Sequence, residues 1–190
     1  MGPTPRSDEP RPAAGAAAFD TVRFRAALGR FATGVTVVGH RADDGSSRGI
    51  TVNAFSAVSL DPPLILVAIA RGARSHDLLA DKPFSVSVLK VEQEALARHF
   101  AGETQDVEIR WVQGTVAPRI AEPLAWIECQ PWAEYDGGDH TLYVGRVVDF
   151  LFGDGDALGF YSSRFVPVAR PVPSQPPVPY DPFELPYDAP

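Results

Sequence analysis

The sequence predicts a mainly β domain, built as a closed or half-closed antiparallel barrel. Many short apolar segments of strand length are separated by turns rich in glycine and proline, such as residues 61–63 and 137–140. Only a few stretches have helical spacing, and this combination favours a barrel over a parallel sheet. With 190 residues, 45% of them apolar, the chain can bury one ordinary core, so one domain is expected.

The composition narrows the classes of function. A net charge of -7 and a pI near 5.0 argue against a nucleic-acid-binding surface. The single cysteine, Cys129, excludes an intramolecular disulfide, and four scattered histidines predict no metal site. The first twelve residues have no signal-type apolar core, and the longest apolar runs have strand length. These features predict a cytoplasmic protein with no membrane segment.

Three regions are expected along the chain. Residues 1–18 are rich in proline, alanine and glycine and predict a disordered arm. Residues 19–166 form the domain, which begins with a helix capped by Asp20. The inward face of that helix is predicted from four apolar side chains at helical spacing, namely Val22, Phe24, Leu28 and Phe31. Residues 167–190 form a proline-rich extended tail, because proline cannot donate to a strand ladder.

The most informative stretch is residues 48–70. It begins as the return strand of a hairpin whose first strand covers residues 35–39 and whose loop covers residues 42–47. It continues into a polar bend rich in Ser, Thr and Asn, turns at residues 61–63, and ends in a solid apolar strand over residues 64–70. Short hydroxyl groups and free backbone N–H groups beside a rigid strand suit a phosphorylated ligand.

The remaining elements follow from local patterns. A short helix is expected at residues 76–80, with Ser75 as its N-cap, and a second helix at residues 91–100. Alternation of apolar and small polar residues predicts a strand at residues 84–89. Further strands are expected at residues 109–116, 125–135, 141–152 and 158–162.

An ordered set of motifs then resembles the flavin reductase-like family. The set begins with Phe24, Leu28, Phe31 and the run from Thr33 to Val38, and continues with Gly49, Thr51, Asn53 and the Ser59–Pro63 run. Arg71, Ser75, residues 97–101, Trp111, residues 128–129 and residues 137–140 follow in the family order. Each motif alone is weak, but the order and spacing are specific, and the resemblance covers roughly residues 22–165.

The resemblance implies a fold, an assembly and an activity. The expected fold is an antiparallel Greek-key split β-barrel with two or three flanking helices, usually a homodimer with flavin near the subunit interface. The expected activity is transfer of a hydride from NADH or NADPH to N5 of FMN or FAD, with the reduced flavin supplied to a partner monooxygenase. Two alternatives stay open: a flavoprotein that acts on an organic substrate, and a flavin-binding or partner-binding module without turnover.

The resemblance also implies candidate site residues. The flavin is expected to lie along residues of the first strand and the polar bend, namely Thr33, Val35, Thr36, Thr51, Val52, Asn53, Ala54, Phe55, Ser56 and Ser59. Arg74 and Ser75 are candidates for the phosphate, and Asp139 and His140 are candidates at the Gly-Gly turn. Because hydride transfer needs no strong general acid to begin, His140 is expected to orient ligands.

Two positions depart from the family pattern. Ala54 stands where the family commonly has serine, so a hydroxyl donor is missing beside the flavin. The loop at residues 101–110 is shorter than usual and acidic, on what the family comparison suggests is the nicotinamide side. By contrast, His99 is expected to pack at a helix end and Cys129 to be an inert core residue.

Overall fold

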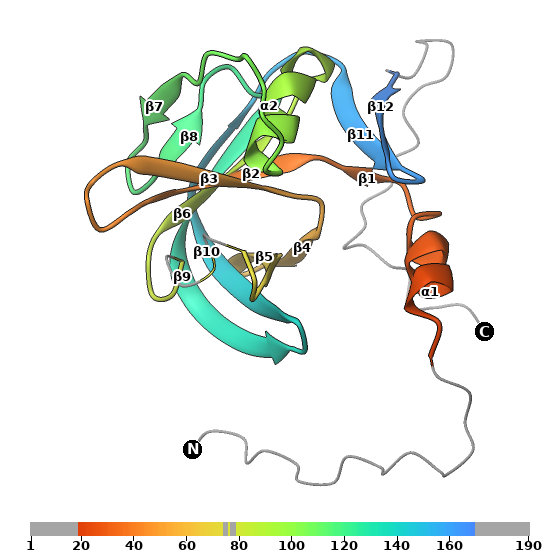
Figure 1. The fold of residues 1–190 in the computed structure, drawn as a ribbon. Helices are drawn as coiled ribbons and strands as arrows, with labels where there is room; N and C mark the ends of the chain where they lie inside the picture. Colours follow the sequence, from red (N-terminus) through yellow and green to blue (C-terminus); the bar gives the residue numbers. More distant parts are fainter. Residues whose placement is uncertain (1–18, 74–75, 77–78, 170–190) are drawn as a thin grey trace, which may run out of the picture.

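The computed structural model describes residues 19–73, 76 and 79–169, and this part is mainly β with two α-helices (Figure 1). The predicted arm at residues 1–18 and residues 170–190 of the predicted tail lie outside it. The elements in chain order are α1 (Thr21–Leu28), β1 (Thr33–Gly34), β2 (Thr36–Arg41), β3 (Ser47–Val52), β4 (Phe55–Leu60), β5 (Pro63–Ala70), β6 (Phe84–Val88), a 3-10 turn (Val91–Gln93), α2 (Glu94–Phe100), β7 (Trp111–Gln113), β8 (Pro118–Ile120), β9 (Ala125–Gly137), β10 (His140–Phe152), β11 (Ala157–Tyr161) and β12 (Arg164–Val168).

One antiparallel sheet of seven strands organises the fold, in the order β3-β2-β6-β9-β10-β5-β4. Its two outermost strands, β3 and β4, are consecutive in the chain and are joined only by Asn53 and Ala54. The sheet therefore curls back on itself, and this two-residue link crosses between its two edges (Figure 1). Smaller sheets, β1-β11-β12 and β7-β8, flank it.

Two apolar clusters fill the interior. The first surrounds β5, where alternate residues Ile65, Val67 and Ile69 are buried, as the prediction of an apolar strand over residues 64–70 required. The second lies under α2, where Leu96 and Ala97 pack with Val37 and Leu158. Together these clusters fix α2 against β2 and β3, which positions the end of α2 beside the edge of the sheet.

Several expected boundaries differ from the structure. The polar bend is confined to Asn53 and Ala54, because residues 55–60 form edge strand β4, where small and polar side chains can face outward. The strand expected at residues 109–116 is only Trp111–Gln113, and its partner β8 was not expected. Strand β12 continues through Pro167, two residues into the predicted tail, and its edge position tolerates the missing N–H.

Helix α1 forms as predicted, but in the described part of the chain its apolar face remains exposed. The Asp20 side chain accepts a hydrogen bond from the backbone N–H of Arg23 at 2.9 Å and caps the helix. Val22 and Phe31 remain 78% and 77% exposed, and no residue of the helix is buried.

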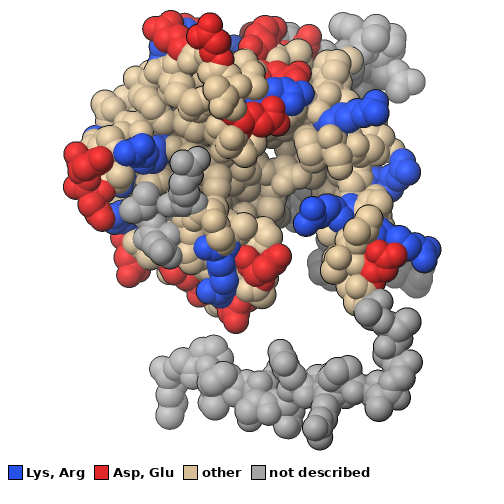
Figure 2. Space-filling model, viewed as in Figure 1, with Lys and Arg blue, Asp and Glu red and all other residues tan. Residues whose placement is uncertain are grey.

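Basic side chains gather on the side of the molecule that carries α1 (Figure 2). In the described part of the chain, no helix is long and apolar enough to span a bilayer.

Two buried titratable side chains, Cys129 and His40, are kept neutral by the fold. Burial, and then the charge of Glu128, raise the pKa of Cys129 to about 12, so its thiol stays protonated, as expected for an inert core residue. His40 is fully buried, and neither ring nitrogen has a hydrogen-bond partner in the described chain. Burial lowers the pKa of His40, helped by Lys82 and Arg48 and partly opposed by the backbone at Arg41.

The lowered pKa of His40 predicts an acid-sensitive fold. Because the unfolded chain binds a proton at this residue near pH 6.5 while the folded chain does not, the free energy of unfolding falls as pH drops below about 6.5. The expected slope is about 1 kcal/mol per pH unit. Urea unfolding between pH 7.5 and 5.5 should show a smaller loss for His40→Leu than for the wild type, and equal losses would contradict the prediction.

Candidate functional site

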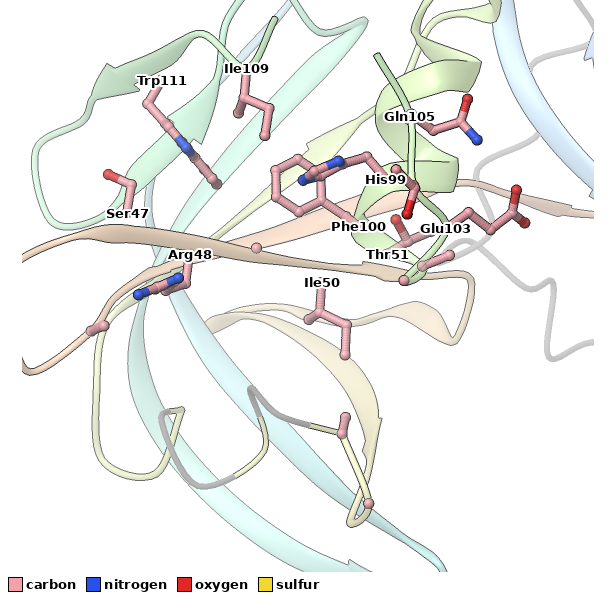
Figure 3. Close-up of a pocket in the computed structure, with 17 residues that line it drawn as sticks. Ser47, Arg48, Ile50, Thr51, His99, Phe100, Glu103, Gln105, Ile109 and Trp111 are labelled. Atoms are coloured by element: carbon pink, nitrogen blue, oxygen red, sulfur yellow. The ribbon is translucent and has the colours of Figure 1, made fainter. Parts of the chain in front are cut away.

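A cavity of about 1040 Å³ runs along the free edge of β3 (Figure 3). Its walls are β3, the end of α2, the following loop at residues 101–105, the side chains of Ile109 and Trp111, and residues Gly72 and Ala73 after β5. Because β3 is an edge strand, alternate backbone N–H and C=O groups along it have no strand partner. A ligand in this cavity therefore meets free backbone donors and acceptors.

Two contacts hold β3 against α2. The Thr51 hydroxyl donates a hydrogen bond to the carbonyl of Ala97 at 2.7 Å. Gly49 lies under the Phe100 ring, and a Cβ at this position would come within 3.0 Å of that ring. The Phe100 ring can pack directly on the β3 backbone because position 49 is glycine. This close packing of Phe100 on β3 forms part of the cavity wall.

Three aromatic rings from two segments, α2 and β7, meet at this wall (Figure 3). Phe100 packs edge-on against Trp111, with ring centroids 5.6 Å apart, and against His99 at 5.1 Å. Nδ1 of His99 is buried and has no hydrogen-bond partner among the described residues. His99 is at the helix end, as predicted, but it also lines the cavity, where a ligand role was not expected.

The short acidic loop is anchored at its base. Arg98 forms ion pairs with Glu94 at 2.7 Å and with Glu103 at 3.2 Å, which ties α2 to the loop. The guanidinium group of Arg98 also lies 5.0 Å from the centre of the Phe165 ring. Residues 101–105 therefore have a fixed start beside the cavity.

The link between β3 and β4 is the second feature of the site. Asn53 and Ala54 are exposed, and within the described residues the Asn53 side chain makes no hydrogen bond. The carbonyl of Ala54 accepts a hydrogen bond from the N–H of Ala68 at 3.0 Å, which fixes the link beside β5. On the other edge of β5, His140 pairs with Ala70. The structure thus brings the polar link and His140 to the same end of β5.

The remaining residues predicted around this link have mixed environments. Val52 is buried, while Phe55 and Ser59 are half-buried. The Ser56 hydroxyl is exposed and contacts the carbonyl of Ala57 at 3.0 Å. Side chains of Asn53, Ala54 and Ser56 are therefore the accessible ones in this group.

Most side chains of residues 33–36 are buried or hydrogen-bonded within the fold and are not available to a ligand. The Thr36 hydroxyl donates a hydrogen bond to the carbonyl of Val52 at 2.7 Å, and Val35 is completely buried. Thr33 differs, because its Oγ1 is buried and lacks a partner in the described chain. Since Thr36 pairs with Val52, this segment runs next to the link between β3 and β4.

The turn that carries Asp139 and His140 is held by Arg71. The guanidinium of Arg71 donates to the carbonyl of Gly138 at 2.9 Å and pairs with Asp136 at 2.8 Å. Nδ1 of His140 lies 2.6 Å from a carboxylate oxygen of Asp139. The hydrogen bond and charge of His140 hold the pKa of Asp139 below its usual value. The carboxylate therefore orients the imidazole ring.

Other predicted residues fall partly outside the described chain. Arg74 and Ser75 are not described, although they directly follow Ala73, which lines the cavity. The helix expected at residues 76–80 is seen only as a bend at His76 and turns at Leu79 and Ala80, because residues 77 and 78 are also outside. Among the described residues no group of three or more His, Cys, Asp or Glu could hold a metal ion.

Of the predicted residues in the described chain, only Thr51 lines the cavity itself. Sequence reasoning gave no ligand role to Arg48, Ile50, His99 or Trp111, which also line it. Arg48 and Ile50 lie on the strand already singled out, so their position on β3 was the available signal. The convergence of His99 and Trp111 had no local signal, because α2 and β7 meet only in the folded chain.

The sequence matches the flavin reductase like domain over residues 28–169. The chain belongs to the flavin reductase-like family. It is 39% identical over 148 residues to an NADH-dependent flavin reductase from Rhodococcus sp, covering 76% of this chain and 84% of that protein. It is also 39% identical over 132 residues to the reductase component of 4-hydroxyphenylacetate 3-monooxygenase from Thermus thermophilus, covering 69% and 85%.

A solved structure agrees with this membership. The NADH:FAD oxidoreductase SgcE6 of Streptomyces globisporus C-1027, in complex with NAD and FAD fragments, superposes with a TM-score of 0.72 at 39% identity. The similarity covers 82% of this chain and 94% of that one. The family resemblance inferred from the ordered motifs is thus confirmed.

Proposed function

We propose that this chain is an NAD(P)H-dependent flavin reductase that supplies reduced flavin to a partner monooxygenase. The observation that carries the proposal is the cavity along β3, next to the exposed Asn53–Ala54 link, in a chain of this family. In the reaction, a hydride and its electron pair pass from C4 of the dihydronicotinamide to flavin N5, and a proton from solvent completes the reduced flavin. The coenzyme leaves in its oxidised form. We infer that the reaction takes place in the cytoplasm.

The residues present fit a flavin nucleotide. Free backbone groups at the edge of β3 and at the Asn53–Ala54 link match the donors and acceptors of the flavin pyrimidine ring. The buried Oγ1 of Thr33, which has no partner among the described residues, lies in the segment beside this link and offers one further polar contact. We place the flavin along Thr51–Phe55, with Val35, Thr36 and Val52 holding this segment in place from inside the fold.

The phosphate end of the flavin belongs at the far side of the link. Ser56 and Ser59 of β4 provide hydroxyl groups, and Arg74 and Ser75 follow the cavity residue Ala73 in the chain. His140, oriented by Asp139, orients the flavin or the nicotinamide from the other edge of β5. Both FMN and FAD, and both NADH and NADPH, fit this arrangement.

The function is tested by steady-state oxidation of NADH and of NADPH with added FMN or FAD. Turnover with at least one pair is expected, and anaerobic NADH or NADPH should bleach the flavin absorbance. Absence of turnover with all four pairs, by a folded protein, would refute the assignment.

Ala54→Ser is expected to tighten flavin binding up to about tenfold, because a hydroxyl near the flavin adds one hydrogen bond. Ala54 is exposed in the link, so the new side chain does not disturb the core. Flavin fluorescence quenching measures the dissociation constant. Ala57→Ser is the matched control, since Ala57 is exposed on β4 but belongs to its paired part. Equal affinities for the wild type and Ala54→Ser would contradict the prediction.

We further propose that the protomer is a Greek-key split barrel that works as a homodimer. The supporting observation is apolar surface that the protomer leaves uncovered on α1 and at the end of β10, where Phe150 and Phe152 are 63% and 76% exposed. A second copy of the same chain buries such patches through an isologous contact. Light scattering after gel filtration should give twice the protomer mass, and a Phe150→Asp, Phe152→Asp double variant should be monomeric. A wild-type protein that is monomeric at micromolar concentration would exclude the dimer.

A further inference from the structure

We propose that the part of the cavity between Trp111 and Arg48 is a subsite for the adenosine monophosphate half of a dinucleotide. The inference rests on the proposed reductase function and deepens it. FAD differs from FMN by this half, and NADH differs from reduced nicotinamide mononucleotide by the same half. The chemistry of the subsite is therefore shared by two substrates, and an experiment has to separate them.

The size of the cavity is the first observation. Its volume of about 1040 Å³ is at the upper end of ordinary ligand pockets, which span roughly 300–1,000 Å³. The residues proposed to contact flavin occupy one end, at Thr51 and the link that follows it. The aromatic wall of His99, Phe100 and Trp111 lies further along β3 and is not used by that placement.

The chemistry of this wall suits a purine base. Phe100 and Trp111 are inclined by 64° to each other, and His99 and Phe100 by 89°, so the wall holds π-surfaces in more than one orientation. Stacking of a nucleobase on an aromatic side chain needs only a flat π-surface. The amide of Gln105 and the hydroxyls of Ser47 and Thr104 also line the cavity and provide hydrogen-bonding groups for a ribose or a base.

Arg48 supplies the charge that a phosphate needs. Apart from the histidine, it is the one basic side chain among the described residues that line the cavity. Its ion pair with Asp44 is long, at 3.6 Å, and both side chains are more than half exposed, so the guanidinium can turn to a phosphate with little loss. A guanidinium group can hold two phosphate oxygens at once.

The position of Arg48 sets how the ligand would lie. Arg48 projects from the opposite side of β3 to Phe100 and Trp111, and the cavity wraps around the free edge of the strand between them (Figure 3). A nucleotide whose base stacks on the aromatic wall places its phosphate at this edge, within the reach of Arg48. The subsite thus binds the base and the phosphate of one nucleotide at the same time.

Matched pairs of substrates test the proposal. The KM ratio of FAD to FMN, measured with one reductant, and the KM ratio of NADH to reduced nicotinamide mononucleotide, measured with FMN, each isolate the adenosine monophosphate half. Arg48→Gln and Trp111→Ala should raise at least one of these ratios about tenfold, the size expected for one lost phosphate contact or one lost stacking contact. A rise in the flavin ratio assigns the subsite to FAD, and a rise in the coenzyme ratio assigns it to NAD(P)H.

The controls use the same residue types elsewhere on the surface. Trp132 is 52% exposed on β9, and Arg110 pairs with Glu122 at 3.0 Å, both outside the cavity, so Trp132→Ala and Arg110→Gln should leave the two ratios unchanged. Trp111 also packs against the core, so Arg48→Gln, at an exposed position, keeps the test valid if Trp111→Ala fails to fold. If neither ratio moves by more than twofold in folded Arg48→Gln, the subsite is refuted.

A binding measurement separates this inference from the reductase function. Calorimetric titration with ADP-ribose needs no turnover, and Arg48→Gln should weaken its binding about tenfold. Unchanged or absent ADP-ribose binding overturns the subsite even where the wild-type enzyme reduces FMN. Binding that depends on Arg48 supports the subsite even where reduction fails, in which case only the proposed reaction is wrong.

Discussion

Gly114→Ala is expected to lower the free energy of unfolding by about 3–5 kcal/mol, the size of the loss when a buried ion pair is broken. Gly114 follows β7, and a Cβ built on it falls on the Glu128 carboxylate and 2.5 Å from the carbonyl oxygen of Ala117. The second contact is with backbone, so moving a flexible side chain end cannot relieve it. The carboxylate or the turn has to shift.

The Glu128 carboxylate cannot move without losing its buried partners. Glu128 is fully buried on β9, where it pairs with Arg119 at 3.0 Å and accepts a hydrogen bond from the backbone N–H of Val116 at 2.8 Å. Arg119 also stacks over Trp126, 4.1 Å from its ring centre. Displacing Glu128 leaves a buried charge without partners, which is the origin of the large penalty.

The effect should reach the cavity as well. The turn at Gly114 joins β7 to β8, and β7 begins with Trp111, whose ring packs against Phe100. Urea unfolding followed by circular dichroism measures the stability, and Gly153→Ala is the control, because its nearest foreign atom is 4.0 Å away. A Gly114→Ala protein within about 1 kcal/mol of the wild type would contradict the position given to Glu128, since point changes away from such features stay within about 0.5 kcal/mol.

This region also shows what local sequence patterns reveal and what they leave out. The apolar run of β5 and the alternation of β6 predict buried strands, because period and burial are properties of the segment itself. Glu128 lies in a strand with nothing nearby in sequence to mark it as buried and paired. Its partners come from the β7–β8 hairpin, and only the folded chain brings Gly114, Val116 and Arg119 to it.

The candidate site divides in the same way. The residues around Asn53 were proposed from the sequence because their order along the chain follows a family pattern. The cavity wall was not predicted from the sequence. Arg48, His99 and Trp111 belong to three elements that meet only through the pairing of β2 with β3 and the packing of α2. Helical spacing likewise indicated an apolar face on α1, but spacing carries no information about which surface covers that face.

His140→Ala is expected to reduce kcat/KM for flavin reduction about a hundredfold, the loss that a small misplacement of reacting groups produces. The ring is 40% exposed and lies where β10 begins, opposite the end of β5, on the side of the strand away from the Asn53–Ala54 link. Because an ionised carboxylate only accepts hydrogen bonds, the contact with Asp139 makes Nδ1 the donor and leaves Nε2 to face a ligand. We expect His140 to act by holding the flavin and the nicotinamide in the orientation that hydride transfer needs.

The matched variant separates orientation from chemistry at this residue. Asp139→Asn keeps an oxygen acceptor beside Nδ1, so it should retain most of the activity and lose less than tenfold, the effect of weakening one hydrogen bond. Single-turnover reduction of flavin by NADH, recorded anaerobically, should show the His140→Ala defect in the hydride-transfer rate rather than in coenzyme affinity alone. Wild-type kinetics for His140→Ala would remove His140 from the site. The orienting role would then fall to backbone groups of β3 and of the Asn53–Ala54 link, which side-chain substitution cannot delete.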